Sequence, residues 1–158
     1  MENRDIPDSD ANITLREVTR ETVRTICRLD VAENQKKFVA PNAVSIAEAY
    51  FARDTAWFRA IYAGETPVGF VMVADDPEKG DYFLWRFMID WRYQGKGFGK
   101  KALELVIQRV KGCPGVKAFY TSHVKQDGGP EGFYKKIGFV DTGKIEHGEH
   151  VMKLELNY

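Results

Sequence analysis

A glycine-rich segment at residues 92–101, Arg-Tyr-Gln-Gly-Lys-Gly-Phe-Gly-Lys-Lys, constrains this 158-residue chain more than any other feature. It follows an apolar, aromatic run at 82–89 and precedes a strongly helical run at 100–110. Its three alternating glycines lack a Cβ, so they allow left-handed φ values and a close approach of backbone N–H groups to an anion. The helix adds unpaired N–H groups and the positive end of its dipole. We therefore interpret the segment as a cradle for a pyrophosphate group.

Three lysines, Lys96, Lys100 and Lys101, lie within or directly after this turn and add positive charge to it. The competing interpretation is a plain tight turn without a ligand. A dinucleotide fingerprint requires Gly-x-Gly-x-x-Gly in an early βαβ unit, and the spacing here differs. The Walker pattern Gly-x4-Gly-Lys-[Ser/Thr] is also absent. Spacing alone favours phosphate binding over a structural turn.

Composition indicates one soluble globular domain. Hydrophobic residues make up 44% of the chain and charged residues 29%, which is typical of a folded protein and not of a disordered one. The 23 basic and 23 acidic residues cancel, which argues against a nucleic-acid-binding module. The lysines around the glycines are thus expected to be a local feature of a site.

The termini and cysteines indicate a cytoplasmic protein. Residues 1–11 are polar and are predicted to form a flexible leader, without a signal peptide or a membrane anchor. Cys27 and Cys113 lie far apart without metal-ligand spacing, so we expect two buried thiols in a reducing compartment. No metal site is predicted.

Periodicity and capping signals predict the first elements. We expect a strand at 13–17, a helix from an N-cap at Thr19 to about Leu29, and then a loop containing residues 33–35 and 41–42. Ser45 followed by Glu48 reads as a capping box for a second helix, from Ile46 to about Arg53.

The remaining elements alternate strands with two further helices. The predicted strands lie at 57–63, 68–74, 82–89, 116–123, 139–145 and 150–156, and the helices at 100–110 and 130–137. Turns are expected at Gly64-Glu-Thr-Pro67 and at His147-Gly148-Glu149. This order predicts an α/β (α+β) fold, a single domain at 12–158 with a mixed central sheet and helices packed on its faces.

The pattern Gln94-x-x-Gly97-x-Gly99 after an apolar strand, with Phe133-Tyr134-Lys-Lys-Ile-Gly138-Phe139 downstream, resembles the GNAT superfamily of acetyl-coenzyme A-dependent N-acetyltransferases. The resemblance extends to the order of elements and implies a mostly antiparallel sheet. It implies that backbone amides of one loop bind the coenzyme A pyrophosphate: Gln94, Gly95, Lys96, Gly97, Phe98, Gly99 and Lys100. It also implies that the main chain of Met88, Ile89 and Asp90 hydrogen-bonds the pantetheine arm, as a strand edge left unpaired would.

More narrowly, the chain is similar to bacterial spermidine/spermine (polyamine) N-acetyltransferases. The shared phrases are Glu33-Asn34-Gln35, the run from Trp85 to Gly97, and the ending Gly148-Glu149-His150-Val151-Met152. Relatives usually carry Asn where this chain has Asp127, which accepts but does not donate hydrogen bonds when ionised. Asp127 is nevertheless expected to contact the cofactor arm.

The resemblance implies that Tyr134 occupies the position of the family's catalytic tyrosine, where its phenol would protonate the departing thiolate. The alternative is that Tyr134 merely packs beside Phe133 in the core. An N–H near Ile89 could polarise the thioester carbonyl. The base that removes the amine proton is left open among Glu33, Asp81, Asp90, His123 and a water chain, because Trp85 occupies the place of a glutamate used by some relatives.

A polyamine acceptor would require spaced carboxylates and aromatic walls. Glu33, Asp30, Glu48 and Asp90 could supply the carboxylates, and Trp57, Trp85 and Trp91 the walls, although core packing is the alternative for each tryptophan. Glu33, Trp85 and His123 are the predicted substrate-binding residues.

The predicted activity is acetyl transfer from acetyl-CoA, as cosubstrate, to a primary amine of a small molecule, and the resemblance implies a polyamine such as spermidine or spermine. Other acceptors left open are an amino acid, an aminoglycoside-like compound and a protein N-terminus. A non-catalytic acyl-CoA-binding sensor is the alternative outside enzymes. By analogy with the family, a homodimer is expected, with no nucleic acid and no membrane as partner.

Overall fold

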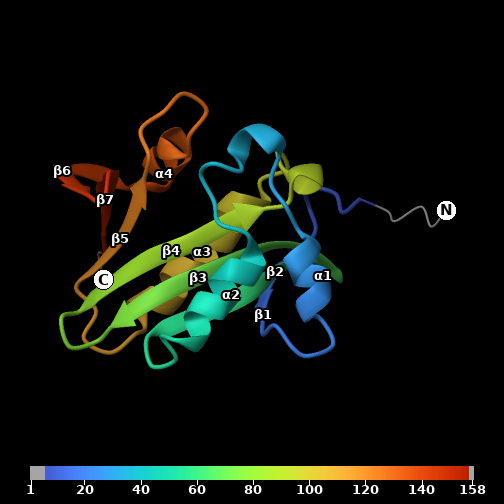
Figure 1. Cartoon of the computed structure of the whole chain (residues 1–158), viewed down its shortest axis with the longest axis horizontal. Coiled ribbons are helices and arrows are strands. Elements are labelled where there is room, and N and C mark those ends of the chain that lie inside the picture. Colours follow the sequence, from blue (N-terminus) through green and yellow to red (C-terminus); the bar gives the residue numbers. More distant parts are fainter. Residues whose placement is uncertain (1–5, 157–158) are drawn as a thin grey trace.

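Seven strands form one sheet in the order β1-β2-β3-β4-β5-β7-β6 (Figure 1). The structure is a computed structural model and describes residues 6–156. The strands are β1 (Ile13–Arg16), β2 (Ala56–Ala63), β3 (Thr66–Asp76), β4 (Asp81–Ile89), β5 (Ala118–His123), β6 (Val140–Glu146) and β7 (Glu149–Glu155). The helices are α1 (Val23–Arg28), α2 (Asn42–Tyr50), α3 (Phe98–Lys111) and α4 (Glu131–Ile137), with single 3-10 turns η1 (Glu33–Gln35) and η2 (Trp91–Tyr93).

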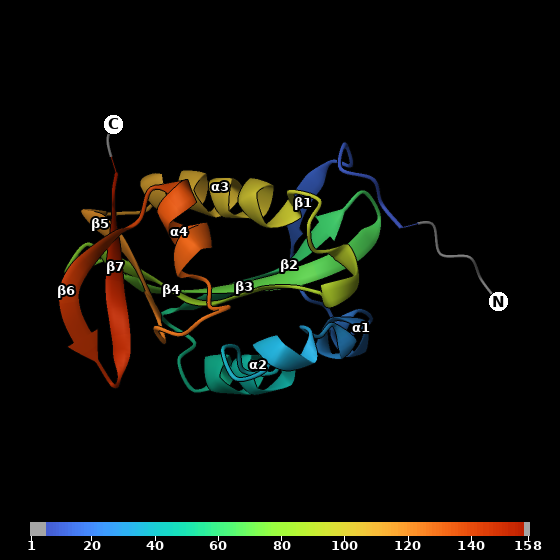
Figure 2. The ribbon, with the colours of Figure 1, turned by 90° about the horizontal axis from the view of Figure 1, so that it is seen from above.

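Helices cover both faces of the sheet (Figure 2), with α3 and α4 on one face and α1 and α2 on the other. Alternation along β3 explains why both faces are apolar. Val71 and Val73 belong to the core under α3, whereas Phe70 and Met72 belong to the core under α1 and α2. Within residues 6–156, all strand pairs are antiparallel except β4 with β5. The predicted mixed, mostly antiparallel α/β fold is confirmed.

The starts of the first two helices differ from the prediction. The N-cap of α1 is Thr22 rather than Thr19, and the Thr22 hydroxyl accepts a hydrogen bond from the Thr19 N–H at 2.8 Å. In α2 the N-cap is Pro41, and Ser45 lies buried inside the first turn with its hydroxyl 3.5 Å from the Pro41 carbonyl. The predicted capping box is therefore wrong. Proline presets a helical φ at a position that needs no N–H donor, and it outweighed the serine signal.

The predicted hairpins are confirmed. β2 and β3 join through a turn at Gly64, whose φ is +58°. β6 and β7 join through His147 and Gly148, with φ values of 50° and 78°. Positive φ at both positions is what a two-residue hairpin turn of type I′ requires, so glycine suits the second.

The central feature of the fold is a fork between β4 and β5. The two strands pair in parallel only from Asp81–Ala118 to Leu84–Thr121, and in the described chain no β5 residue pairs with β4 beyond Leu84. Trp85 is an extra residue in β4, because Leu84 faces Val73 and Arg86 faces Met72 on β3. Such a bulge bends a strand and increases its twist. The strands diverge from this point (Figure 1), which exposes one edge of β4 over Trp85–Ile89.

Other predictions concern the ends of the chain and its cysteines. Residues 1–5 of the predicted leader lie outside the described residues. Within its remainder, the Ser9 carbonyl accepts a hydrogen bond from Lys101 Nζ at 2.6 Å, and Ala11 packs against the core. Cys27 and Cys113 are free, as expected, but partly exposed rather than buried. Over residues 6–156, no helix is long and apolar enough to cross a membrane.

Candidate active site

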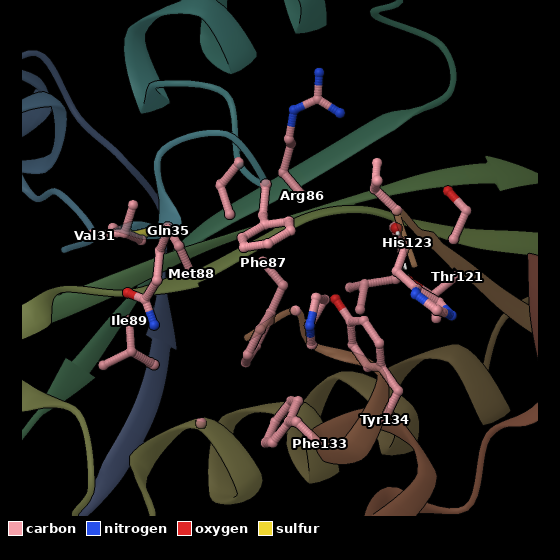
Figure 3. Close-up of a pocket in the computed structure, with 18 of the residues that line it drawn as sticks. Val31, Gln35, Arg86, Phe87, Met88, Ile89, Thr121, His123, Phe133 and Tyr134 are labelled. Carbon is pink, nitrogen blue, oxygen red and sulfur yellow. Dashed lines mark hydrogen bonds between the residues drawn. The ribbon is translucent and has the colours of Figure 1, made fainter. Parts of the chain in front are cut away.

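The fork opens into a cavity of about 1130 Å³. One wall is the exposed edge of β4, and the opposite wall is formed by the end of β5 and by α4 (Figure 3). The loop from Val31 to Pro41 borders the cavity on the α2 side. The predicted pyrophosphate cradle at residues 94–100, which we call the anion loop, closes the far end of the cavity. Segments separated by about a hundred residues therefore converge on one space.

The anion loop has the backbone that its glycines predicted. Gly95 and Gly97 have φ values of +78° and +82°, and Gly97 is the N-cap of α3. A Cβ at either position would meet nothing within 4 Å, so backbone conformation rather than packing requires glycine there. The side chain of Phe98 is buried and anchors the start of the helix. No side chain caps the start of α3 among the described residues, so its first N–H groups have the geometry that an anion site requires.

Most of the residues predicted to bind the coenzyme line this cavity. They are Met88, Ile89, Gln94, Gly95, Gly97, Phe98, Gly99 and Lys100. Lys96, Asp90 and Asp127 are not among the lining residues. The Asp127 residue is exposed, and the neighbouring Gly128, Gly129 and Pro130 line the cavity in its place.

The Asp90 carboxylate follows the end of β4 and is held by hydrogen bonds outside the cavity. The residue is 1% exposed and accepts hydrogen bonds from the Arg92 N–H, from Arg92 Nε at 2.8 Å and from the Asp30 N–H at 3.0 Å. Burial raises its pKa, but these hydrogen bonds and the Arg92 charge outweigh burial, and the net pKa is lowered. The carboxylate is therefore ionised, paired and outside the cavity, which does not suit a catalytic base.

Tyr134 lies in the wall opposite β4, 7% exposed, with its ring against Phe133 and Phe139. Burial raises its pKa to about 12, the negative charge of Glu149 adds to the shift, and hydrogen bonding with the Thr121 hydroxyl opposes it. The phenol is consequently protonated throughout the neutral range. It is available as a proton donor to an atom held in the cavity.

The cavity floor is apolar. The Phe133 ring stacks on Phe87 of β4 with centroids 5.9 Å apart. A Cβ at Gly99 would lie 3.5 Å from both Phe133 and Ile89, which is an ordinary contact distance, so the first turn of α3 lies against this floor. Side chains from β4, α3 and α4 thus meet beneath the fork.

Residues 22–139 match the sequence profile of the acetyltransferase (GNAT) family, which is more than half of the chain. The chain belongs to the GNAT acetyltransferase family. It is 31% identical over 155 residues to the spermine/spermidine N(1)-acetyltransferase of Bacillus subtilis strain 168, and the alignment covers 92% of this chain and 99% of that protein. The predicted enzyme class, an acetyl-CoA-dependent N-acetyltransferase, is confirmed by this membership.

Solved GNAT structures share the fold. The Thermoplasma acidophilum PaiA N-acetyltransferase, in complex with coenzyme A, superposes with a TM-score of 0.70 at 18% identity and covers 92% of this chain and 99% of its own. The Vibrio cholerae spermidine N-acetyltransferase, in complex with coenzyme A and spermine, gives a TM-score of 0.68 at 16% identity. The alignment covers 89% of this chain and 92% of that chain.

The carboxylates expected to bind a polyamine form ion pairs with other side chains of this GNAT domain. Glu33 and Asp30 pair with Lys36, at 2.7 and 3.4 Å, and Glu48 pairs with Arg86 at 3.4 Å. Neither these three nor Asp90 line the cavity. The acidic side chains that do line it are Glu146 and Glu149, in the turn region of β6 and β7.

Of the three tryptophans, only Trp85 lines the GNAT cavity, and it also packs against the core under α1 and α2. Trp57 lies under the guanidinium groups of Arg59 and Arg109. Trp91 is exposed and lies outside the cavity. The bulge in β4 explains the difference, because it places Trp85 at the point where the fork opens.

His123, the third predicted substrate-binding residue, lines the cavity at the open end of β5. Sequence reasoning missed several other lining residues: Gln35, Phe38, Arg86, Phe87, Thr121, Phe133, Glu146 and Glu149. The alternation of β5 could have identified Thr121, because it lies on the same face as His123. Nothing local marked Glu146 or Glu149, which reach the cavity only because β7 pairs with β5.

Proposed function

We propose that this enzyme transfers the acetyl group of acetyl-CoA to a primary amine of a polyamine such as spermidine or spermine. The observation that carries the proposal is one cavity that joins an anion loop, a free strand edge and a buried tyrosine. Two similarities support it: the relative at 31% identity is named as a spermine/spermidine N(1)-acetyltransferase, and structural neighbours were solved with coenzyme A.

In this proposal the pyrophosphate of the cosubstrate lies against the loop 94–100. Backbone N–H groups at the start of α3, the helix dipole and Lys100 supply the positive potential there. The amide-bearing arm runs along β4, whose edge over Trp85–Ile89 is left without a β5 partner in the described chain. Hydrogen bonds to that edge would satisfy main-chain groups that the fork leaves unpaired.

Tyr134 then acts as the general acid. The neutral amine nitrogen attacks the thioester carbonyl, the C–S bond breaks, and the phenol transfers its proton to the departing sulfur. Its raised pKa keeps the proton on the phenol until that step. The apolar floor of Phe87 and Phe133 excludes water from the same region.

The acceptor side of the cavity contains two carboxylates, Glu146 and Glu149, and an aromatic wall that includes Trp85 and Phe38. The Glu149 carboxylate also accepts a hydrogen bond from the Ser122 hydroxyl at 3.3 Å, which fixes it at the end of β5. Carboxylates can pair with the distal ammonium groups of a polyamine, and aromatic faces suit both its methylene groups and its charge.

A second candidate acceptor is an amine that also carries a carboxylate, such as an amino acid. Lys36, Lys37 and Arg86 line the same cavity, and Arg86 Nε is buried without a hydrogen-bond partner within residues 6–156. A carboxylate on the acceptor could accept from that group.

The deciding experiment measures release of free coenzyme A thiol with acetyl-CoA and a panel of spermidine, spermine, putrescine, lysine and an aminoglycoside. The proposal predicts the largest kcat/KM for a polyamine. It also predicts that Glu149→Gln raises the KM for spermidine roughly tenfold, the value of one lost ionic contact of about 1.4 kcal/mol. Glu155→Gln, on β7 but outside the cavity, is the matched control.

Preference for lysine would favour the second candidate. Tight binding of acetyl-CoA with no thiol release for any amine would instead indicate a sensor domain.

A further inference from the structure

His123 is a buried polar side chain without a visible partner. It is 3% exposed, and neither Nδ1 nor Nε2 makes a hydrogen bond within residues 6–156. It also lines the cavity. Buried polar groups in folded proteins are nearly always hydrogen-bonded, and an exception calls for an explanation. The simplest explanation is that a ligand atom in the cavity supplies the missing partner.

The position of His123 is fixed relative to the proposed acid. Thr121, which hydrogen-bonds with Tyr134, and His123 are two residues apart on β5, so they lie on the same face about 7 Å apart along the strand. Figure 3 shows His123, Thr121 and Tyr134 at one end of the cavity, opposite Val31 and Gln35. The imidazole therefore lies on the same side of the cavity as the acid, toward the end of β5 that no longer pairs with β4.

The other candidate bases are not in the cavity. Asp81 is the first residue of β4, at the closed end of the fork, where it pairs with Asp76 and Ala118. Glu33 is exposed and bonded to Lys36, and the Asp90 carboxylate is held by Arg92. Neither Asp81, Glu33 nor Asp90 lines the cavity.

We propose that His123 is the general base of the transfer, a step that rests on the proposed function. The neutral imidazole accepts one proton from the acceptor ammonium, which leaves a lone pair on nitrogen. That lone pair forms the new N–C bond while the C–S bond breaks, and Tyr134 protonates the sulfur. The amide sheds its second proton to the phenolate, and the imidazolium releases its proton to solvent. The net products are the N-acetyl amine, free coenzyme A thiol and one proton.

The surroundings of His123 carry charges of both signs. His150 of β7 stacks on it with centroids 5.8 Å apart. Glu131 on α4 and Asp141 on β6 interact electrostatically with His123 and with Lys125 after β5. The titratable groups Tyr134, Glu146, His147 and Glu149 line the same cavity. Histidine is the side chain whose ordinary pKa lies closest to neutral, which suits exchange of a proton with solvent between turnovers.

The test compares the pH dependence of kcat/KM for spermidine in the wild type and in His123→Gln, which keeps a polar side chain but cannot take up the proton. At pH 7 we expect a loss on the order of 10²-fold or more, because a general base typically contributes that much. The loss should shrink steadily toward pH 10, where solvent supplies the neutral amine. The Kd of acetyl-CoA should stay within about twofold of the wild type.

The matched control is His150→Gln, since His150 is the stacked neighbour but is not among the lining residues, and its profile should follow the wild type. If His123→Gln does not fold, His123→Phe, which keeps a ring against His150, is measured in the same way. A loss of kcat/KM that is equal at every pH would show that His123 has a merely structural role. An unchanged kcat/KM would exclude His123 as the general base. A wild type that acetylates no amine would overturn the proposed function itself before any variant is compared.

Discussion

The side-chain amides of Gln35 and Gln94 hydrogen-bond to each other in both directions, with N···O distances of 3.2 and 2.9 Å across 59 positions of sequence. Gln94 Nε2 also donates to the Ile89 carbonyl at 2.9 Å, and Gln35 Oε1 accepts from the Ala32 N–H at 3.2 Å. The pair thus connects the loop from Val31 to Pro41 to the anion loop and to the last residue of β4. Because both loops border the cavity, ordering one of them favours order in the other.

A double-mutant cycle tests this connection. Gln35→Ala and Gln94→Ala should each weaken acetyl-CoA binding, and the double variant should be little worse than either, because each single change already removes the shared contact. The expected coupling energy is about 0.5–1.5 kcal/mol, measured by calorimetric titration of acetyl-CoA. Asn34→Ala, next to Gln35 but outside the lining, is the control. Strictly additive effects would mean that the two loops are independent.

Replacement of Tyr134 by phenylalanine should lower kcat on the order of 10²-fold or more with little change in acetyl-CoA affinity, because it removes only the transferred proton. Steady-state kinetics and equilibrium titration measure the two quantities. Tyr82→Phe is the control: Tyr82 is a buried tyrosine of β4 whose hydroxyl donates to the Pro114 carbonyl, away from the cavity. Equal turnover in Tyr134→Phe and the wild type would remove Tyr134 from the mechanism.

The raised pKa of Tyr134 also predicts a pH effect on stability. The folded state holds this proton up to about pH 12, whereas an unfolded tyrosine loses it near the ordinary value of 10.0. The stabilisation is therefore complete below pH 10 and is lost as the pH rises toward 12. Urea unfolding at several alkaline pH values should show a shallower decline for Tyr134→Phe than for the wild type. Parallel declines would contradict the burial of the phenol.

Gly97→Ala should weaken acetyl-CoA binding tenfold or more. A Cβ is disfavoured at a φ of +82° by roughly 1–2 kcal/mol, so the loop shifts away from the conformation that presents its N–H groups. Gly143→Ala on β6 is the matched control, because Gly143 has a φ of +80°, equally open space around it and no place in the cavity. It should lose stability but keep its acetyl-CoA Kd. If both variants bind alike, the loop does not form the anion site.

Asp90→Asn should lower the free energy of unfolding at pH 7 by about 1–3 kcal/mol, because the Arg92 and Asp30 donors lose part of the buried acceptor that they share. The pKa of Asp90 is lowered in the folded state, so its contribution is present at neutral pH and is lost as the pH falls through that pKa. The gap between the two proteins should accordingly close on acidification, as followed by urea unfolding. Glu104→Gln, exposed on α3, provides the baseline. Loss of turnover without loss of stability would return Asp90 to the list of bases.

Local pattern was sufficient for the fold class and for the backbone conformation of the glycine loop before α3. Strand alternation, turn glycines and a 3.6-residue period depend on neighbours in the chain, so they are legible without tertiary contacts. It was not sufficient for the start of α2, where Pro41 and Ser45 offered competing signals only four residues apart.

The roles of the charged residues were decided by the tertiary structure. The sequence suggested Glu33, Glu48 and Asp90 as partners for a cation, but they pair with Lys36, Arg86 and Arg92, and none of the three carboxylates lines the cavity. Whether a carboxylate is free depends on which cation folding brings within about 4 Å, and composition does not specify that.

The sequence by itself determined a glycine turn between a strand and a helix, with left-handed backbone at Gly95 and Gly97, and it predicted an anion site there with a catalytic tyrosine downstream. Only the tertiary structure decided that β4 and β5 part after Leu84 and Thr121, that Gln35 meets Gln94, and that His123 is buried with both nitrogens unpaired among the described residues. The physical reason is that each of these depends on groups brought together from distant parts of the chain, whose pairing follows from packing rather than from any local preference.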